Sequence, residues 1–581
     1  MPYRFTPHRF TLNHPASRHP LRSCARSRWH VALAAALLLV GLLLPALSAA
    51  QTPTRVEEAL LRASNADVED RFGWSVAIDG DRAIVGTRDE DGPSDGLTDA
   101  GAAYVFERDA SGTWTEEAVL RASNAGRGDV FGWSVAIDGD RAIVGAYSED
   151  GPSGGLPGSG AAYVFERDAS GTWTEVALLR ASNAGEDDLF GGSVAIDGDH
   201  AIVGARYEDG PSDGLSFSGA AYVFERDASG TWGTSDPDGF QTETALLRAS
   251  NAGQGDLFGG SVAIRGDRAI VGADEERGPS NELDASGAAY VFERDASGTW
   301  TEVALLRASN ADAFDSFGRS VAIDGDRAIV GALGEEGPSD GLRSSGAAYI
   351  FERDASGTWG TSASGGFRTE TALLRASNAG EDDVFGRRVA IDGDRAIVGA
   401  YLEDGSSDGL DASGAAYVFE RSADGTWGIT DPDGFQTETA LLRASNASGG
   451  DGFGYSVAID GDRVIVGASS EDGPSDGLSD SGAAYVFSLS DNPIPVELTD
   501  FDAQASGEAV ALTWHTASET NNTGFEVQRA AVETSRRDVS TVASMAWESV
   551  GFVEGAGTTA KPQTYRFRDA APPFADSLVY R

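Results

Sequence analysis

The chain has 581 residues with 91 Asp and Glu against 44 Lys and Arg, a formal net charge of −47 at pH 7. Such a charge repels nucleic acid phosphates and anionic membrane surfaces, so neither is an expected partner. The only cysteine, Cys24, and four of the six histidines lie within residues 1–30, which leaves His200 and His515 in the rest of the chain. A disulfide, a thiolate nucleophile, a catalytic triad and a multi-histidine zinc site are therefore not expected.

The N-terminal segment has the pattern of a signal peptide. Residues 1–30 carry arginines and no acid, residues 31–44 are apolar, and Ser48-Ala49-Ala50 offers the small residues that a signal peptidase reads. We expect a signal peptide over residues 1–50, cleaved between Ala50 and Gln51, and a short linker over 51–56. The alternative is an uncleaved membrane anchor, because residues 31–50 are close to spanning length. Either interpretation predicts export, to the medium or to the outer surface of a bacterium.

A unit of 59 or 68 residues then repeats seven times, and its copies begin at Phe72, Phe131, Phe190, Phe258, Phe317, Phe385 and Phe453. A fixed period of this size indicates supersecondary units that bury their apolar faces only by stacking. In the second copy we expect strands at residues 134–138, 141–146, 161–167 and 176–181. The turn Asp138-Gly139-Asp140 suits a tight hairpin because Asp-Gly tolerates positive φ.

The number of strands predicts a closed ring. The fourth-strand motif occurs seven times, but its first copy, at residues 59–63, precedes the first Phe-Gly unit, and none follows Tyr485-Val486-Phe487. Pairing the N-terminal strand with the last unit removes an exposed edge. We therefore predict an all-β fold: a seven-bladed β-propeller of four-stranded blades over residues 57–488, closed by the N-terminal strand.

The pieces Phe131-Gly132, Gly145-Ala146 and Gly160-Ala161-Ala162-Tyr163-Val164-Phe165 resemble the FG-GAP repeat of integrin α-subunit propellers and of many exported bacterial proteins. The resemblance implies a propeller that binds ligands on its loop-rich face. In the integrin-like form, the hairpin between the first two strands holds calcium. Here that hairpin has shrunk to Asp138-Gly139-Asp140, too short to surround a cation that needs six to eight oxygens, so no metal site of that type and no cofactor are expected.

The connections between strands two and three and between successive blades are acidic and should emerge on one face. The loop Asp89-Glu90-Asp91-Gly92-Pro93-Ser94-Asp95 is compatible with weak calcium binding, but its composition favours a solvated turn. Periods three, five and six carry nine-residue insertions between strands three and four, which we expect to project from the opposite face. Their Phe240, Phe367 and Phe435 are either aromatic platforms for a ligand or, as we favour, side chains folded onto their own blade. Trp74 and Trp133 are interpreted as packing variants.

After a linker at 489–494 the composition changes. Residues 495–581 contain short alternating segments that predict a small β-sandwich, apparently incomplete, with His515 on a strand. The run from Pro495 to Phe501, followed by Trp514-His515-Thr516, resembles the fibronectin-type-III-like module common in exported proteins of the Bacteroidota type. The resemblance implies a module that usually precedes a type IX secretion sorting domain.

The blades are nearly identical, whereas catalytic groups must differ from their counterparts, so we predict a non-catalytic propeller that binds protein or glycan ligands as a monomer. The alternatives are a carbohydrate-active enzyme with paired carboxylates at the propeller axis and a passive acidic coat protein. Lys561 is the only lysine, and an acidic, lysine-poor surface suits high salt. A thermal midpoint that does not rise in molar salt would contradict this last hypothesis.

Overall fold

The computed structural model describes residues 55–489, apart from 93–95, 212–213, 238, 279–281, 338–340, 406–409, 432–434 and 474–476, and residues 496–580, apart from 507–508, 533–547, 560–562 and 570–576. The predicted signal peptide, with its cleavage site at Ala50 and Gln51, lies outside the described residues. The chain divides into two compact units, one ending at Leu489 and the other containing residues 490–581, and each is described by itself.

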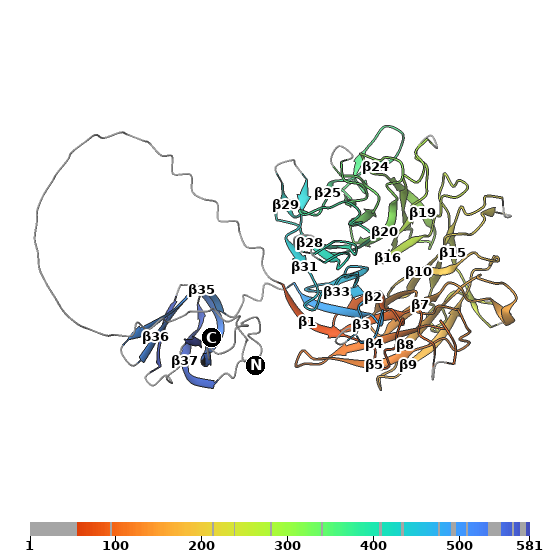
Figure 1. Cartoon of the computed structure of the whole chain (residues 1–581). Coiled ribbons are helices and arrows are strands. Elements are labelled where there is room, and N and C mark those ends of the chain that lie inside the picture. The colour runs from red at the N-terminus through yellow and green to blue at the C-terminus, as the bar shows by residue number, and fades with distance from the viewer. Residues whose placement is uncertain are drawn as a thin grey trace, which may run out of the picture. The chain divides into compact units, whose positions relative to one another are not determined.

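The first unit consists of seven antiparallel sheets arranged as blades around an axis (Figure 1). Blade 1 contains β2 (Phe72–Asp79), β3 (Arg82–Thr87), β4 (Ala102–Arg108) and β5 (Trp114–Leu120), and blade 2 contains β6 (Ser134–Asp138), β7 (Arg141–Ala146), β8 (Ala161–Arg167) and β9 (Trp173–Leu179). Blade 3 contains β10 (Phe190–Asp197), β11 (His200–Ala205), β12 (Ala220–Glu225) and β15 (Ala245–Leu247), and blade 4 contains β16 (Ser261–Arg265), β17 (Arg268–Ala273), β18 (Ala288–Arg294) and β19 (Trp300–Leu306). Blade 5 contains β20 (Phe317–Asp324), β21 (Arg327–Ala332), β22 (Ala347–Glu352) and β25 (Ala372–Leu374), and blade 6 contains β26 (Arg388–Asp392), β27 (Arg395–Ala400), β28 (Ala415–Glu420) and β31 (Ala440–Leu442). A 3-10 turn, η1 (Pro152–Gly154), lies in blade 2. The predicted all-β propeller is confirmed.

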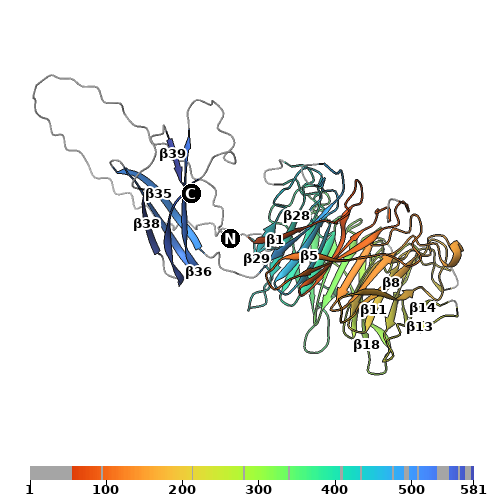
Figure 2. The same cartoon turned by 90° about the horizontal axis from the view of Figure 1, so that it is seen from below.

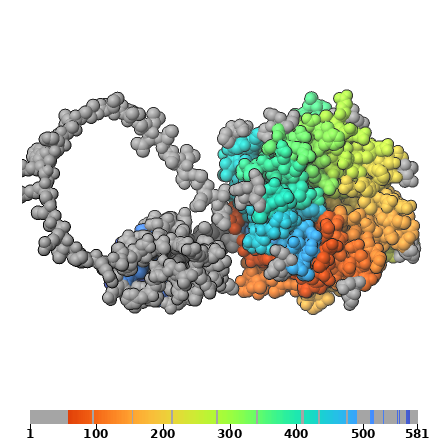
Figure 3. Space-filling model, in the orientation of Figure 1, coloured from red at the N-terminus to blue at the C-terminus, as the bar shows by residue number. Residues whose placement is uncertain are grey.

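Blade 7 is completed by the N-terminal strand. It contains β32 (Ser456–Asp460), β33 (Arg463–Ala468) and β34 (Ala483–Ser488), and β1 (Val56–Leu61) pairs antiparallel with β34, Leu60 opposite Tyr485. The two ends of the propeller therefore lie side by side, red beside blue in Figure 3. The closure predicted from the strand count is confirmed, and it pairs the outer edge of β34.

The two glycines that recur in every repeat hold neighbouring blades together. Gly132 begins blade 2 at φ +92°, and a Cβ there would lie 2.2 Å from the carbonyl oxygen of Ala102 in blade 1. A Cβ on Gly86, the penultimate residue of β3, would lie 2.0 Å from the carbonyl oxygen of Gly132. Only glycine fits such a close approach of two backbones. The Phe beside this contact, Phe131, is fully buried.

The apolar core lies between blades rather than within one blade. Ile143 and Leu179 of blade 2 pack against Val203 and Tyr222 of blade 3, and similar clusters join the other neighbouring blades. Strand positions are therefore buried on both faces, which explains why the middle strands, such as Ala161–Arg167, lack apolar–polar alternation.

The three insertions form hairpins: β13 (Thr234–Ser235) with β14 (Gln241–Thr242), β23 (Thr361–Ser362) with β24 (Arg368–Thr369), and β29 (Ile429–Thr430) with β30 (Gln436–Thr437). We expected them to project from one face, and this was wrong. Each instead pairs with the outermost strand of the preceding blade, as β14 does with β9. Figure 2 shows β13 and β14 at the edge of the propeller. The outermost strand of a blade has unpaired backbone groups, and each hairpin pairs with the last residue of that strand.

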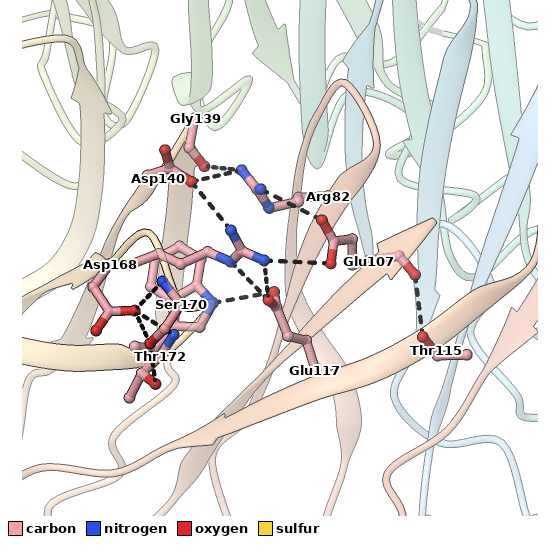
Figure 4. Close-up of polar contacts among 11 residues, drawn as sticks. Arg82, Glu107, Thr115, Glu117, Gly139, Asp140, Asp168, Ser170 and Thr172 are labelled. Atoms are coloured by element: carbon pink, nitrogen blue, oxygen red, sulfur yellow. Dashed lines mark hydrogen bonds and ion pairs between the residues drawn. The ribbon is translucent and has the colours of Figure 1, made fainter. Parts of the chain in front are cut away.

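The face that carries the hairpin turns, here called the turn face, is crossed by ion pairs between neighbouring blades (Figure 4). Arg82 of blade 1 contacts Asp140 in the first turn of blade 2 at 3.0 Å. Arg167 of blade 2 reaches Glu117 at 2.6 Å and Glu107 at 3.5 Å, both in blade 1. These carboxylates thus have a structural role in joining blades, and similar pairs recur around the ring.

The C-terminal unit is a sheet of five strands: β35 (Val496–Ser506), β36 (Ala509–Val532), β37 (Glu548–Thr559), β38 (Gln563–Asp569) and β39 (Ser577–Tyr580). All four other strands pair with β36, which carries His515 as predicted. Val510, Leu512 and Trp514 form a small core. The fibronectin-type-III-like assignment and its link to type IX secretion stay predictions.

Candidate binding site on the loop face

The face opposite the turn face, here called the loop face, is held by a four-residue network that recurs in every blade. In blade 2, Glu149 accepts hydrogen bonds from the side chains of Arg180 at 2.6 Å and Asn124 at 3.0 Å. Its second oxygen accepts the backbone N–H of Gly151 at 2.9 Å, and Tyr163 donates to Asn124 at 2.8 Å. We call Tyr163, Asn124, Glu149 and Arg180 and their counterparts the clasp. Because Asn124 precedes the blade and Arg180 follows its last strand, the clasp joins two successive blade connections.

The clasp corrects our interpretation of the acidic loops. Glu90 was read as part of a solvated turn or a weak calcium loop, yet only 2% of its surface is exposed, and it contacts Arg121 and Asn65. Asp91 in the same loop accepts the backbone N–H of Asp99 at 3.0 Å. Among the described residues, no group of three or more His, Cys, Asp or Glu side chains is placed to hold a metal ion. Residues 93–95 of this loop are not described.

The phenylalanines of the insertions cover the clasp arginines of three blades. Phe240 lies 5.6 Å from the guanidinium of Arg180, and Phe367 and Phe435 face Arg307 and Arg375 in the same way. The side chain of Arg180 is 5% exposed, whereas that of Arg121, in a blade without such a hairpin, is 27% exposed. The three phenylalanines therefore lie over clasp arginines of the preceding blade, whereas we had expected contacts with their own blade.

A ring of divergent residues surrounds the propeller axis on the loop face. Each blade contributes two residues to this ring. The first directly follows the Phe-Gly pair at the start of the innermost strand, and the second directly follows the second strand. The first set is Trp74, Trp133, Gly192, Gly260, Arg319, Arg387 and Tyr455, and the second is Arg88, Tyr147, Arg206, Asp274, Leu333, Tyr401 and Ser469. We call these fourteen residues the axial ring. The neighbouring strands repeat almost residue for residue, whereas no two blades carry the same pair of residues at these two positions.

One side of the axial ring is a continuous aromatic stack. The rings of Trp74 and Trp133 are 4.8 Å apart, those of Trp74 and Tyr455 are 4.6 Å apart, and those of Trp133 and Tyr147 are 4.4 Å apart. The guanidinium of Arg88 lies 3.7 Å over the ring of Trp74. Trp74 and Tyr455 are buried, which agrees with a packing role, but Trp133 and Tyr147 are only half-buried. Their exposed faces are available to a ligand.

The other side of the axial ring is cationic. Arg319 and Arg206 share the carboxylate of Asp274, at 3.0 and 3.9 Å. Arg387 lies 4.8 and 4.6 Å from the ring centres of Tyr401 and Tyr455. Sequence reasoning identified the two tryptophans but missed these arginines. Only the fold reveals that positions 59 or 68 residues apart meet around one axis.

Burial of a loop-face aspartate makes stability depend on pH. Asp315 is 2% exposed, and burial, followed by the nearby carboxylate of Glu335, raises its pKa to about 7. The folded state thus retains a proton that the unfolded state loses near pH 4, so stability falls as pH rises from about 4 to 7. We expect Asp315→Asn, which can still accept the N–H of Asp312, to stabilise the protein at pH 8 by about 1–2 kcal/mol and to have little effect at pH 4. Urea unfolding at both pH values measures this.

Asp354 on the turn face is the matched control. Hydrogen bonds from the Ser356 hydroxyl and the Thr358 N–H hold the pKa of its carboxyl below the usual value. It therefore contributes stability above its unfolded pKa, and Asp354→Asn should destabilise at pH 8. The same sign for both substitutions would contradict the assignment.

The comparison with protein families agrees with this geometry. The model of the FG-GAP repeat matches residues 56–106, 114–165, 173–224, 241–292, 300–351, 369–419 and 436–487, more than half of the chain. Each of the seven segments contains the outermost strand of one blade and the first three strands of the next. The chain belongs to the FG-GAP repeat family. A search among curated proteins found no match. Within the FG-GAP propeller and the described part of the second unit, no helix has the length and apolar character needed to cross a membrane.

Proposed function

We propose that this FG-GAP protein is a non-catalytic binding module, exported to the medium or to the outer surface of a bacterium, whose propeller binds a protein or glycan ligand on the axial ring. The observation that carries the proposal is the contrast within the propeller. The contacts of the paired glycines, the turn-face ion pairs and the clasp repeat around the ring, whereas the axial ring differs from blade to blade. Contacts that only hold blades together have no reason to differ, but a ligand that lies across the axis meets each blade differently.

The carboxylates near the axis do not favour the enzymatic alternative. On the turn face, the last residue of the innermost strand is aspartate in six blades, and each of these aspartates accepts the backbone N–H of a turn glycine in the next blade, as Asp79 does from Gly139 at 2.8 Å. Such a repeated hydrogen bond has a structural role, because it joins neighbouring blades. A catalytic pair needs two carboxylates with different environments, one to hold a proton and one to release it.

Binding by the full chain to glycan and protein arrays tests the proposal. We expect Trp133→Ala to weaken capture of the array ligand at least tenfold, since aromatic residues at the centre of interfaces contribute most of the binding energy. Trp173→Ala is the matched control, because this half-buried tryptophan contacts Glu117 on the turn face, away from the axial ring. Equal losses in both variants would contradict a loop-face site. Release of reducing sugars from a polysaccharide would contradict the non-catalytic assignment.

A further inference from the structure

Two adjacent arginines at the start of blade 6 lack the carboxylate partners that most arginines of the propeller have. Arg141, Arg226, Arg294 and many others form ion pairs. Among the described residues, no ion pair joins Arg387 or Arg388 to a carboxylate. The partners of Arg387 are the two tyrosine rings and the hydroxyl of Tyr455, to which it donates at 2.8 Å.

Arg388 interrupts a ring of serines that joins the innermost strands. The homologous residue is serine in the six other blades: Ser75, Ser134, Ser193, Ser261, Ser320 and Ser456. Five of these hydroxyls accept a backbone N–H from the next blade, as Ser75 does from Val135 at 3.1 Å. Arg388 makes one long hydrogen bond, 3.5 Å, to the backbone oxygen of Arg387. A structural contact has thus been replaced by a cation beside the axial ring.

The surroundings of Arg388 are predominantly cationic. Burial and the charges of Arg387 and Arg319 lower its pKa to about 9, while Tyr455 and the single carboxylate of Asp274 act in the opposite direction. Arg319 and Arg206 already share that carboxylate. Arg388 is half-buried, and a partly desolvated cation without a counter-charge destabilises a fold. In a chain of net charge −47, such an arrangement is unexpected unless an anion completes it.

We propose that Arg387, Arg388 and Arg319 form a seat for the carboxylate or sulfate group of an acidic saccharide bound on the axial ring. Guanidinium groups match the planar geometry of carboxylates and bind them bidentately. The half-buried aromatic faces of Trp133, Tyr147 and Tyr401 suit the apolar faces of sugar rings, which favours an acidic saccharide over an acidic peptide. This inference rests on the proposed binding function and names the class of ligand.

Calorimetric titration of the full chain with an oligogalacturonate, its neutral galactose counterpart and a sulfated oligosaccharide tests the seat. We expect the acidic saccharides to bind at least tenfold more tightly than the neutral one. Arg388→Ser, which restores the residue of the other six blades, should remove this preference without loss of folding. Arg265→Asp is the control, because it likewise restores the common residue of the repeat, at the turn-face end of blade 4, and should leave affinity unchanged.

Three results would overturn the seat. Equal affinity of the wild type and Arg388→Ser for oligogalacturonate would show that the arginine does not bind the anion. An equal rise of the thermal midpoint with sulfate in both would show a general salt effect. Binding of a polyaspartate peptide in place of the saccharides would refute the saccharide assignment. If Trp133→Ala still abolishes array binding in any of these cases, the proposed function stands without the seat.

Discussion

A chain that begins at Arg62 and so lacks β1 is expected to lose its cooperative fold or to assemble into oligomers. Without β1, blade 7 has three strands and the edge of β34 is exposed. The lost contacts include the buried side chain of Leu61, the partly buried Leu60, and the ion pair of Arg55 with Glu420 at 2.9 Å. Burial of two leucines alone corresponds to about 3–6 kcal/mol.

The control is a chain that begins at Gln51 and retains β1. Urea unfolding and size-exclusion chromatography compare the two chains, and a synthetic peptide of residues 55–62 should restore the shorter one to a monomer. A shorter chain that unfolds at the same urea concentration as the control, and remains monomeric, would show that ring closure does not stabilise the propeller.

Replacement of the clasp glutamate should lower the free energy of unfolding, and the loss should be larger in blades whose clasp is covered by an insertion hairpin. Glu149→Ala leaves the nearly buried Arg180 without a counter-charge, which costs about 3–5 kcal/mol. Glu90→Ala removes the same hydrogen bonds in blade 1, where Arg121 is 27% exposed and can turn to water. We expect that substitution to cost about 1–2 kcal/mol, closer to the effect of losing an exposed pair and a few hydrogen bonds.

Chemical unfolding of both variants provides the comparison. Each glutamate accepts hydrogen bonds from one Asn, one Arg and one glycine N–H. The difference between the two losses of unfolding free energy therefore reports how deeply the arginine is buried. Phe240→Ala should expose Arg180 and reduce the cost of Glu149→Ala toward that in blade 1. Equal costs in the two blades would show that the insertion hairpins do not seal the clasp.

Local sequence reasoning located the strands of the second copy well. The predicted strands at 134–138, 141–146 and 161–167 coincide with β6, β7 and β8, because hairpin turns at Asp-Gly and short apolar runs are local signals. The fourth strand begins three residues earlier than predicted, at Trp173. Ring closure could also be predicted from the sequence, because the last repeat lacks a fourth-strand motif and an extra copy of that motif precedes the first repeat.

The insertions and the acidic loops were misread for a common reason. Their partners lie in other blades or in the connections between blades: Gln241 pairs with Leu179, and Glu90 contacts both Asn65 and Arg121. The composition of a loop shows that it is polar, but not whether a side chain from another blade connection will bury its carboxylate. An Asp-Gly-rich loop therefore looks solvated until the neighbouring connections are placed around it.

The sequence by itself determined the class of fold, the number of blades and the way the ring closes, because these follow from a repeat that buries its apolar faces only by stacking. The tertiary structure alone decided where the divergent residues meet. Trp74, Arg387 and Tyr455 are separated by hundreds of residues or by a whole repeat, and only the convergence of the innermost strands on one axis brings aromatic and cationic side chains into a single ring.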